Sequence, residues 1–339
     1  MKCHGASAVF IALLLSTGLE VRAEDRTIYG ADDRLEFYEV PENFRTAAAA
    51  TVSLWKKPKL EQDPVSGKYN LLTVNFGDSY YLCPEVRFRE QPIGAFCSGE
   101  LVGEDLVLTA GHCIITQSDC DATAVVFGYA INAPGKNART QMDVGDIYSC
   151  SGIIKRKQQD TTVTTDNNPQ LIYGPDYALI RLDRKVAGRK PVPVNRLGGL
   201  KKGDKVFAVG HPVGLPFKFT ANGLVVKEVQ PDAAYFVTNL DSFGGNSGAA
   251  VFNAVTGLIE GIVVRGEGES FIPSFDGCSV YSVRPQNAGY GTAVNKLDLV
   301  LDAIPLLRPV EAAGGGMPAD PAAPGPDEFS ARRAVDFYF

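Results

Sequence analysis

Short apolar runs, each bounded by turn residues, recur through most of this chain. Between residue 81 and Ala293 the runs are rich in valine and aromatic residues, and Gly, Pro, Asn or Asp separates them at short intervals. This pattern favours an all-β sandwich or barrel. Examples of such runs are Ala95–Val102, Leu106–Ala110, Ala124–Tyr129, Tyr177–Leu182, Lys205–Gly210, Phe217–Val229, Tyr235–Leu240 and Ala249–Val264.

The chain divides into four regions by composition. Residues 1–23 form the expected signal peptide, and residues 24–80 form an N-terminal extension or propeptide with two strand candidates, Ala49–Trp55 and Lys68–Phe76. Residues 81–308 form the main domain, which we expect to end in a short helix over Asn295–Leu306, where Pro305 stops it. Residues 309–339 are rich in Gly, Ala and Pro, so we expect a flexible tail.

The first 23 residues are typical of a signal peptide. Lys2 supplies a basic start, Ser7–Leu19 an apolar core, and Ala23 ends a small-residue cleavage site. The apolar core is shorter than the roughly 20 residues that a membrane span needs. We therefore expect an exported mature chain, secreted or periplasmic, without a membrane span.

The cysteine count and the charge exclude several classes of site. Cys3 leaves with the signal peptide, and six cysteines remain, an even number that predicts three disulfides in an exported chain. Their 15 pairings stay open at this point. Without a CxxC pair and with few histidines, we expect no metal site; the paired aspartates are typical of solvated turns. A net charge of −6 without a Lys/Arg cluster argues against nucleic-acid binding.

The stretch DSFGGNSGAAVF, Asp241–Phe252, surrounds Ser247 with glycine. A tight turn before a buried strand would explain it, but so would a nucleophile loop whose backbone N–H groups must approach a ligand closely. A serine nucleophile needs a base. The mature chain offers only His112 and His211, each of which follows an apolar strand and has a purely structural interpretation as well.

The order of the two histidines and Ser247 along the chain excludes another hydrolase fold. No histidine follows Ser247, whereas α/β-hydrolases run Ser, acid, His, and Ala249 stands where their GxSxG motif needs glycine. The remaining order is His112, an acid, then Ser247. Asp176, in GPDYALIRLD, is the preferred acid; it has a competing interpretation as a turn residue, and Asp183 is a weaker candidate.

TAGHC, DYALIRL and GGNSGAAVF together resemble the chymotrypsin-like (trypsin-like) serine peptidases, and GGNSG and IYGADDR resemble their bacterial glutamyl endopeptidase (V8-like) branch. The resemblance covers roughly Ile28 to Leu301. It implies two antiparallel six-stranded β-barrels with His112 as general base, Asp176 as orienting acid and Ser247 as nucleophile. It also implies that the backbone N–H groups of Gly245 and Ser247 form the oxyanion hole.

The same resemblance implies a disulfide between Cys97 and Cys113. Proximity then suggests Cys120–Cys150 and leaves Cys83–Cys278, although the sequence does not fix these two pairs. We also expect a monomer that acts on protein or peptide substrates, and no cofactor, because acyl transfer by such a triad needs neither a metal nor a nucleotide. One departure is Asn246, where animal zymogens carry the aspartate of their activation salt bridge.

Asp241 stands six residues before Ser247, where trypsin-like enzymes carry the aspartate at the base of the specificity pocket. It predicts cleavage after Lys or Arg, because a cationic side chain satisfies a buried carboxylate. Glutamate-specific relatives carry a histidine where this chain has Val263, so an acidic preference is the second choice. Arg265 and Gly266 complete the expected pocket, where Arg265 could pair with Asp241 and neutralise it.

The sequence thus predicts an exported serine endopeptidase with a preference for Lys or Arg, or else an enzyme specific for Glu or Asp. A catalytically silent binding module on the same fold is the alternative from another class, and esterase activity would use the same site. Labelling by a serine-directed fluorophosphonate separates the enzyme from the silent module.

Overall fold

The structure, a computed structural model, describes residues 27–165, 168–266, 269–289 and 291–307. The expected signal peptide at residues 1–23 and the expected tail at 309–339 lie outside these residues. In the described part of the chain, no helix is both long enough and apolar enough to cross a bilayer.

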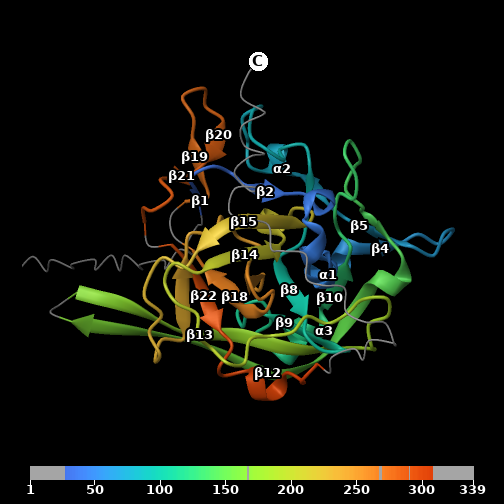
Figure 1. The fold of residues 1–339 in the computed structure, drawn as a ribbon. Coiled ribbons are helices and arrows are strands. Elements are labelled where there is room, and N and C mark those ends of the chain that lie inside the picture. Colours follow the sequence, from blue (N-terminus) through green and yellow to red (C-terminus); the bar gives the residue numbers. More distant parts are fainter. Residues whose placement is uncertain (1–26, 166–167, 267–268, 290, 308–339) are drawn as a thin grey trace, which may run out of the picture. The chain divides into compact units, whose positions relative to one another are not determined.

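Six antiparallel strands close into a first barrel, in the order β10-β12-β13-β9-β8-β3 (Figure 1). Its interior is apolar: Val52, Leu54, Val107 and Val125 are fully buried. β3 follows helix α1 (Arg45–Ala50), so residues of the N-terminal region complete this barrel. The strands are β3 (Thr51–Lys56), β8 (Cys97–Leu101), β9 (Leu106–Thr109), β10 (Thr123–Phe127), β12 (Ile147–Thr165) and β13 (Asn168–Leu182).

A second sheet has the order β16-β22-β18-β17-β14-β15-β2. It curls, because the chain that leaves β15 meets β16: the Val226 N–H donates to the Val237 carbonyl at 2.9 Å. The expected two-barrel fold of the chymotrypsin type is therefore confirmed, with β2 added at the edge. The strands are β2 (Arg34–Leu35), β14 (Lys205–Gly210), β15 (Lys218–Leu224), β16 (Tyr235–Thr238), β17 (Ala250–Asn253), β18 (Ile259–Arg265) and β22 (Thr292–Lys296).

Smaller elements surround the two sheets. β1 (Ile28–Tyr29) pairs in parallel with β21 (Val283–Arg284), and β19 (Phe271–Pro273) forms a hairpin with β20 (Ser279–Tyr281). The remaining strands are β4 (Leu60–Gln62), β5 (Tyr69–Leu71), β6 (Val74–Asn75), β7 (Pro92–Ile93) and β11 (Gln141–Met142), and the other helices are α2 (Phe76–Ser79) and α3 (Gln117–Asp121).

Three disulfides link these elements, with the pairs Cys97–Cys113, Cys120–Cys150 and Cys83–Cys278. Cys97–Cys113 joins β8 to the turn after β9, and Cys120–Cys150 joins α3 to β12. Cys83–Cys278 joins the segment after α2 to the β19–β20 hairpin. These are the pairs that the resemblance, proximity and elimination suggested.

The expected helix at Asn295–Leu306 is wrong in its first part and reduced in its second. Asn295 and Lys296 end strand β22, which pairs with β16 on one side and β18 on the other. Only a 3-10 turn, Leu301–Ala303, remains of the helix. Two-sided strand pairing, which buries Val294 completely, outweighs the local helical spacing of apolar residues.

Candidate active site

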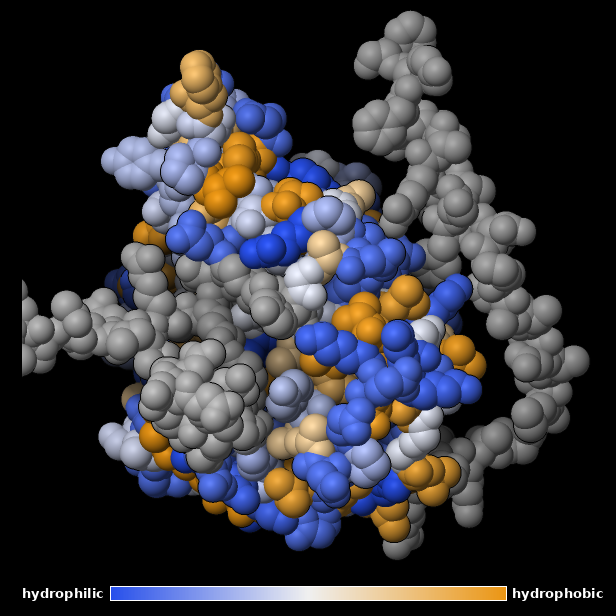
Figure 2. All heavy atoms as spheres, turned by 90° about the vertical axis from the view of Figure 1, so that its left-hand side faces the viewer, coloured by the Kyte–Doolittle hydropathy of each residue, from blue (hydrophilic) through white to orange (hydrophobic). Residues whose placement is uncertain are grey.

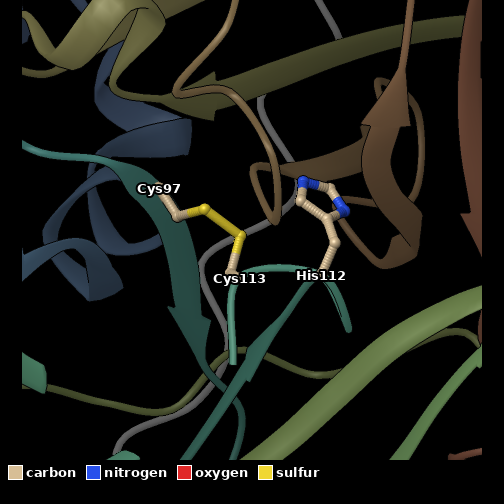
Figure 3. A group of neighbouring side chains, drawn as sticks. All are labelled: Cys97, His112 and Cys113. Atoms are coloured by element: carbon tan, nitrogen blue, oxygen red, sulfur yellow. A yellow bond between two sulfur atoms is a disulfide. The ribbon is translucent and has the colours of Figure 1, made fainter. Parts of the chain in front are cut away.

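The turn after β9 carries His112. The Cys97–Cys113 disulfide fixes this turn to β8 on the C-terminal side of the histidine, and Figure 3 shows the imidazole beside that bond. Cys97, His112 and Cys113 lie close enough to suggest a metal site. The two sulfurs are bonded to each other, however, so neither is the thiolate that a metal would need.

Asp176 holds the imidazole and the backbone of His112 at once. Its Oδ2 lies 2.8 Å from His112 Nδ1, and its Oδ1 accepts the His112 backbone N–H at 3.0 Å. The Asp176 N–H in turn donates to Asn295 Oδ1 at 2.7 Å. This two-point contact fixes the ring so that Nε2 is directed away from the carboxylate, as a base requires.

The charge of Asp176 is maintained although its side chain is only 1% exposed. Burial raises the pKa of this carboxyl. The hydrogen bonds and charge of His112 and the charge of Arg265 lower the pKa by more than burial raises it, so the net shift is downward. Asp176 lies within β13 rather than in a turn. The competing acid Asp183 lies at the surface, where it accepts the Ser149 N–H at 3.2 Å.

Ser247 lies in the loop between β16 and β17 and is 6% exposed. Its carbonyl accepts the Ser98 N–H at 2.9 Å and lies 3.7 Å from Cys113 Sγ. The next residue, Gly248, has φ +85°, and a Cβ there would lie 2.3 Å from Thr109 Oγ1 and 2.9 Å from the Ala110 nitrogen. The serine loop of the second barrel thus packs against the turn of the first barrel that carries His112.

Gly245 shows why the loop has glycine two residues before the serine. Its φ is +85°, and a Cβ there would lie 2.6 Å from the His211 carbonyl and 2.8 Å from the Gly214 nitrogen. The Gly245 carbonyl accepts a hydrogen bond from Ser98 Oγ at 2.8 Å. The backbone N–H of Gly245 has no acceptor among the described residues, which leaves that donor for a ligand.

His211, the other candidate base, has a structural environment. It is 2% exposed, its Nδ1 lies 3.0 Å from the Leu215 carbonyl, and its ring stacks on Tyr129 with centroids 5.8 Å apart. Burial lowers its pKa to about 3, so it stays neutral over the ordinary pH range. Its backbone N–H donates to Ser98 Oγ, the hydroxyl that holds Gly245.

Among the expected pocket residues, Asp241 is the most unusual. It is 3% exposed; Oδ1 accepts the Tyr29 N–H at 2.8 Å, and Oδ2 has no hydrogen-bond partner among the described residues. Burial, with a contribution from the charge of Asp33, raises the pKa of Asp241 well above its usual range. Tyr29 is a contact that the sequence did not suggest, since the two residues are 212 positions apart.

The other expected pocket residues have different surroundings. Val263 is 1% exposed in the apolar core of the second barrel, and Gly266 is buried. Arg265 was a candidate partner of Asp241, but its Nη2 lies 3.3 Å from Asp176 Oδ2 instead. No sequence motif indicates this pairing, because it depends on how β18 packs against β13.

A recess of about 580 Å³ borders the serine loop. Gly244 and Gly245 form one wall, and Tyr80, Phe96 and Phe271 supply aromatic surface. The Tyr80 and Phe271 rings lie 4.8 Å apart. Figure 2 shows apolar side chains at the top of one face, at the height of the β19–β20 hairpin in Figure 1. The aromatic part of the lining offers apolar contact to a ligand beside the serine loop, while Glu269 and Ser270 line the recess as well.

Comparisons with known proteins relate this chain to a peptidase family. The model of the trypsin-like peptidase domain matches residues 97–262, a range that includes His112, Asp176 and Ser247. Among solved structures, a Glu endopeptidase in complex with MPD covers 82% of this chain and 96% of its own, with 16% identity and a TM-score of 0.41. A search of curated proteins gives no significant match.

Proposed function

Because this chain belongs to the trypsin-like serine peptidases, we propose that it is an exported endopeptidase that cleaves peptide bonds through an acyl-enzyme on Ser247. His112 takes the proton of the Ser247 hydroxyl as the oxygen attacks the scissile carbonyl, and then gives that proton to the leaving amine. A water molecule, deprotonated by His112, then attacks the acyl-enzyme and releases the acid product and the Ser247 hydroxyl. Three disulfides support an oxidising destination outside the cytosol.

The two hydrogen bonds from His112 to Asp176, at 2.8 and 3.0 Å, carry this proposal. They hold the proton of the neutral imidazole on Nδ1, leave Nε2 as the acceptor, and stabilise the imidazolium that forms. The N–H groups of Gly245 and Ser247 would stabilise the oxyanion, and such a donor contributes about 2.7–4 kcal/mol to the transition state.

The test is covalent labelling at Ser247 followed by mass spectrometry. A serine-directed fluorophosphonate is expected to form one adduct, on Ser247, and Ser247→Ala is expected to lose both the adduct and peptide hydrolysis. Ser66→Ala, in an exposed turn, is the matched control and should keep both. A folded protein that neither reacts nor hydrolyses peptides would support the silent binding module instead.

We propose further that the enzyme prefers Lys or Arg on the acyl side of the cleaved bond. The support is the unpartnered, buried Oδ2 of Asp241, to which a cationic side chain would supply the missing donor. A preference for Glu or Asp is the second possibility. Val263 offers no charge to bind an acidic side chain, and Arg265 is already engaged with Asp176.

A further inference from the structure

Arg265 contacts the acid of the proposed triad from a neighbouring strand. It is the last residue of β18, and the pairing of β18 with β22 is irregular between Val263 and Arg265. Such an irregularity re-aims a side chain relative to the usual alternation of a strand. The guanidinium reaches Asp176 with its Nη2 3.3 Å from Oδ2, and the Arg265 side chain is only 12% exposed.

The carboxylate oxygen that Arg265 contacts is the one that holds the imidazole. Oδ2 of Asp176 lies 2.8 Å from His112 Nδ1 and 3.3 Å from Arg265 Nη2. Two cationic or potentially cationic groups therefore share one oxygen at a largely buried site. At such a site the effective dielectric constant is below that of water, and charges act on one another more strongly.

We propose that Arg265 is a positioning residue that acts on His112 through Asp176, so that the imidazole remains a neutral base at lower pH than Asp176 alone would allow. This inference rests on the proposed function for its effect on activity. A carboxylate stabilises the protonated imidazole, whereas a guanidinium on the same oxygen repels that positive charge and takes up part of the carboxylate's negative charge. It also keeps Asp176 ionised, so the orientation of the ring persists in mild acid.

Other charged groups near the His112 turn lie on β12. Arg156 Nε donates to the Gly111 and Ile114 carbonyls at 2.8 Å, and the backbone carbonyl of Lys157 faces Gly111. On β22 the neighbour is the uncharged Asn295, followed by Lys296, whose Nζ donates to the Gln230 carbonyl. Of the Lys and Arg side chains in the described residues, Arg265 is the one whose ion pair with Asp176 is formed.

The first experiment compares the pH dependence of kcat/KM in wild type, Arg265→Gln and Arg265→Lys. Loss of the charge in Arg265→Gln is expected to move the acid limb upward by about 0.5–1 pH unit. Arg265→Lys keeps the charge and should restore most of the wild-type profile. A role in packing alone would lower kcat/KM at every pH without moving the limb, and that outcome would overturn the inference.

The second experiment does not depend on catalysis. In a Ser247→Ala background, the C2 proton of His112 is followed by NMR from pH 4 to 9, with and without Arg265→Gln. The mature chain has two histidines, and His211, with a pKa of about 3, does not titrate in this range. The imidazole midpoint should rise in Arg265→Gln. An unchanged midpoint rejects the role of Arg265. A shifted midpoint, together with no hydrolysis by the protein that retains Ser247, rejects only the proposed enzyme activity.

Discussion

The Asp241 carboxylate accepts the backbone N–H of Tyr29 at 2.8 Å, which ties the N-terminal segment to the loop before the proposed nucleophile. The Ser242 N–H donates to the Thr27 carbonyl at 3.2 Å, and Ile28 and Tyr29 pair with β21. Residues 27–29 thus lie between β21 and the loop before the proposed nucleophile, and β3 completes the first barrel. A propeptide that included these strands could not leave without dismantling the fold.

We therefore predict that the start of the mature chain determines activity. A form that begins at Thr27 should be active. One that begins at Ala31 loses the N–H donor of Asp241 and should lose about 5- to 150-fold in kcat/KM, since a buried acceptor that loses its partner costs about 1–3 kcal/mol. Both forms are compared by circular dichroism and by active-site titration. Equal kcat/KM in two folded forms would show that the segment has no part in the site.

The specificity proposal predicts the effect of Asp241→Asn. Peptides with Lys or Arg at the acyl position should lose roughly 100-fold or more in kcat/KM, because removing one member of a buried ion pair costs about 3–5 kcal/mol. Peptides with an uncharged residue there should change little. The measurement is a positional library cleaved by both proteins, and Asp232→Asn, at the surface, serves as the control. A preference for Glu in the wild-type library would reject the proposal.

The proposed triad predicts a contrast between two aspartates. Asp176→Asn should lower kcat by about 10³–10⁴-fold with little change in KM, because the amide no longer fixes the productive tautomer of His112. Asp183→Asn removes the competing acid at the surface and should leave kcat near the wild-type value. Single-turnover kinetics separate acylation from binding. A comparable loss in both variants would indicate damage to β13 rather than to the catalytic acid.

Local sequence predicted much of the fold, and the misses have physical causes. Leu106–Ala110 and Lys205–Gly210 correspond to β9 and β14 because apolar runs of that length suit buried strands. None of the predicted apolar runs covers β12, and residues 158–165 of this strand are mostly polar. Pairing with β13, which Figure 1 shows as a long two-stranded ribbon, makes them a strand.

The candidate site was predicted in part as well. The motifs around His112, Asp176 and Ser247 identify the chemistry because each motif is local in sequence. Partners that come from distant strands left no such signal: Arg265 on Asp176, and Tyr29 on Asp241. Both contacts depend on side-chain directions that only the packed barrels determine.

A buried glutamate outside the site predicts how stability changes with pH. Glu100 is fully buried; Oε2 accepts Thr51 Oγ1 at 3.1 Å, and Oε1 has no partner among the described residues. Burial raises its pKa well above the usual range, so the folded state holds this proton more tightly than the unfolded chain does. The protonated Glu100 carboxyl makes its full contribution to the free energy of unfolding below about pH 4. This contribution is lost as the pH rises from there toward the pKa of Glu100 in the folded state.

Glu100→Gln should therefore raise the melting temperature at pH 7 and leave it nearly unchanged near pH 3.5. Glu104→Gln, at an exposed position, is the control and should shift neither value by more than a degree or so, because surface ion pairs contribute about 0–1 kcal/mol. Calorimetry across this pH range provides the measurement. A destabilised Glu100→Gln at pH 7 would mean that the charged carboxylate is paired in solution.

The recess beside Gly245 predicts a second substrate preference. Phe271 packs against Tyr80 and Phe243, with ring centroids 4.8 and 6.2 Å apart, and removing its ring would open the recess to solvent. Phe271→Ala should lower kcat/KM for peptides with a large apolar residue next to the cleaved bond by roughly 10- to 150-fold, in keeping with about 1.5–3 kcal/mol for burying such a side chain. Peptides with glycine there should be cleaved at the wild-type rate. Phe275→Ala, at the fully exposed tip of the same hairpin, controls for damage to the hairpin. A library varied on both sides of the bond identifies the position, and an equal loss for glycine and apolar peptides would exclude the recess as a subsite.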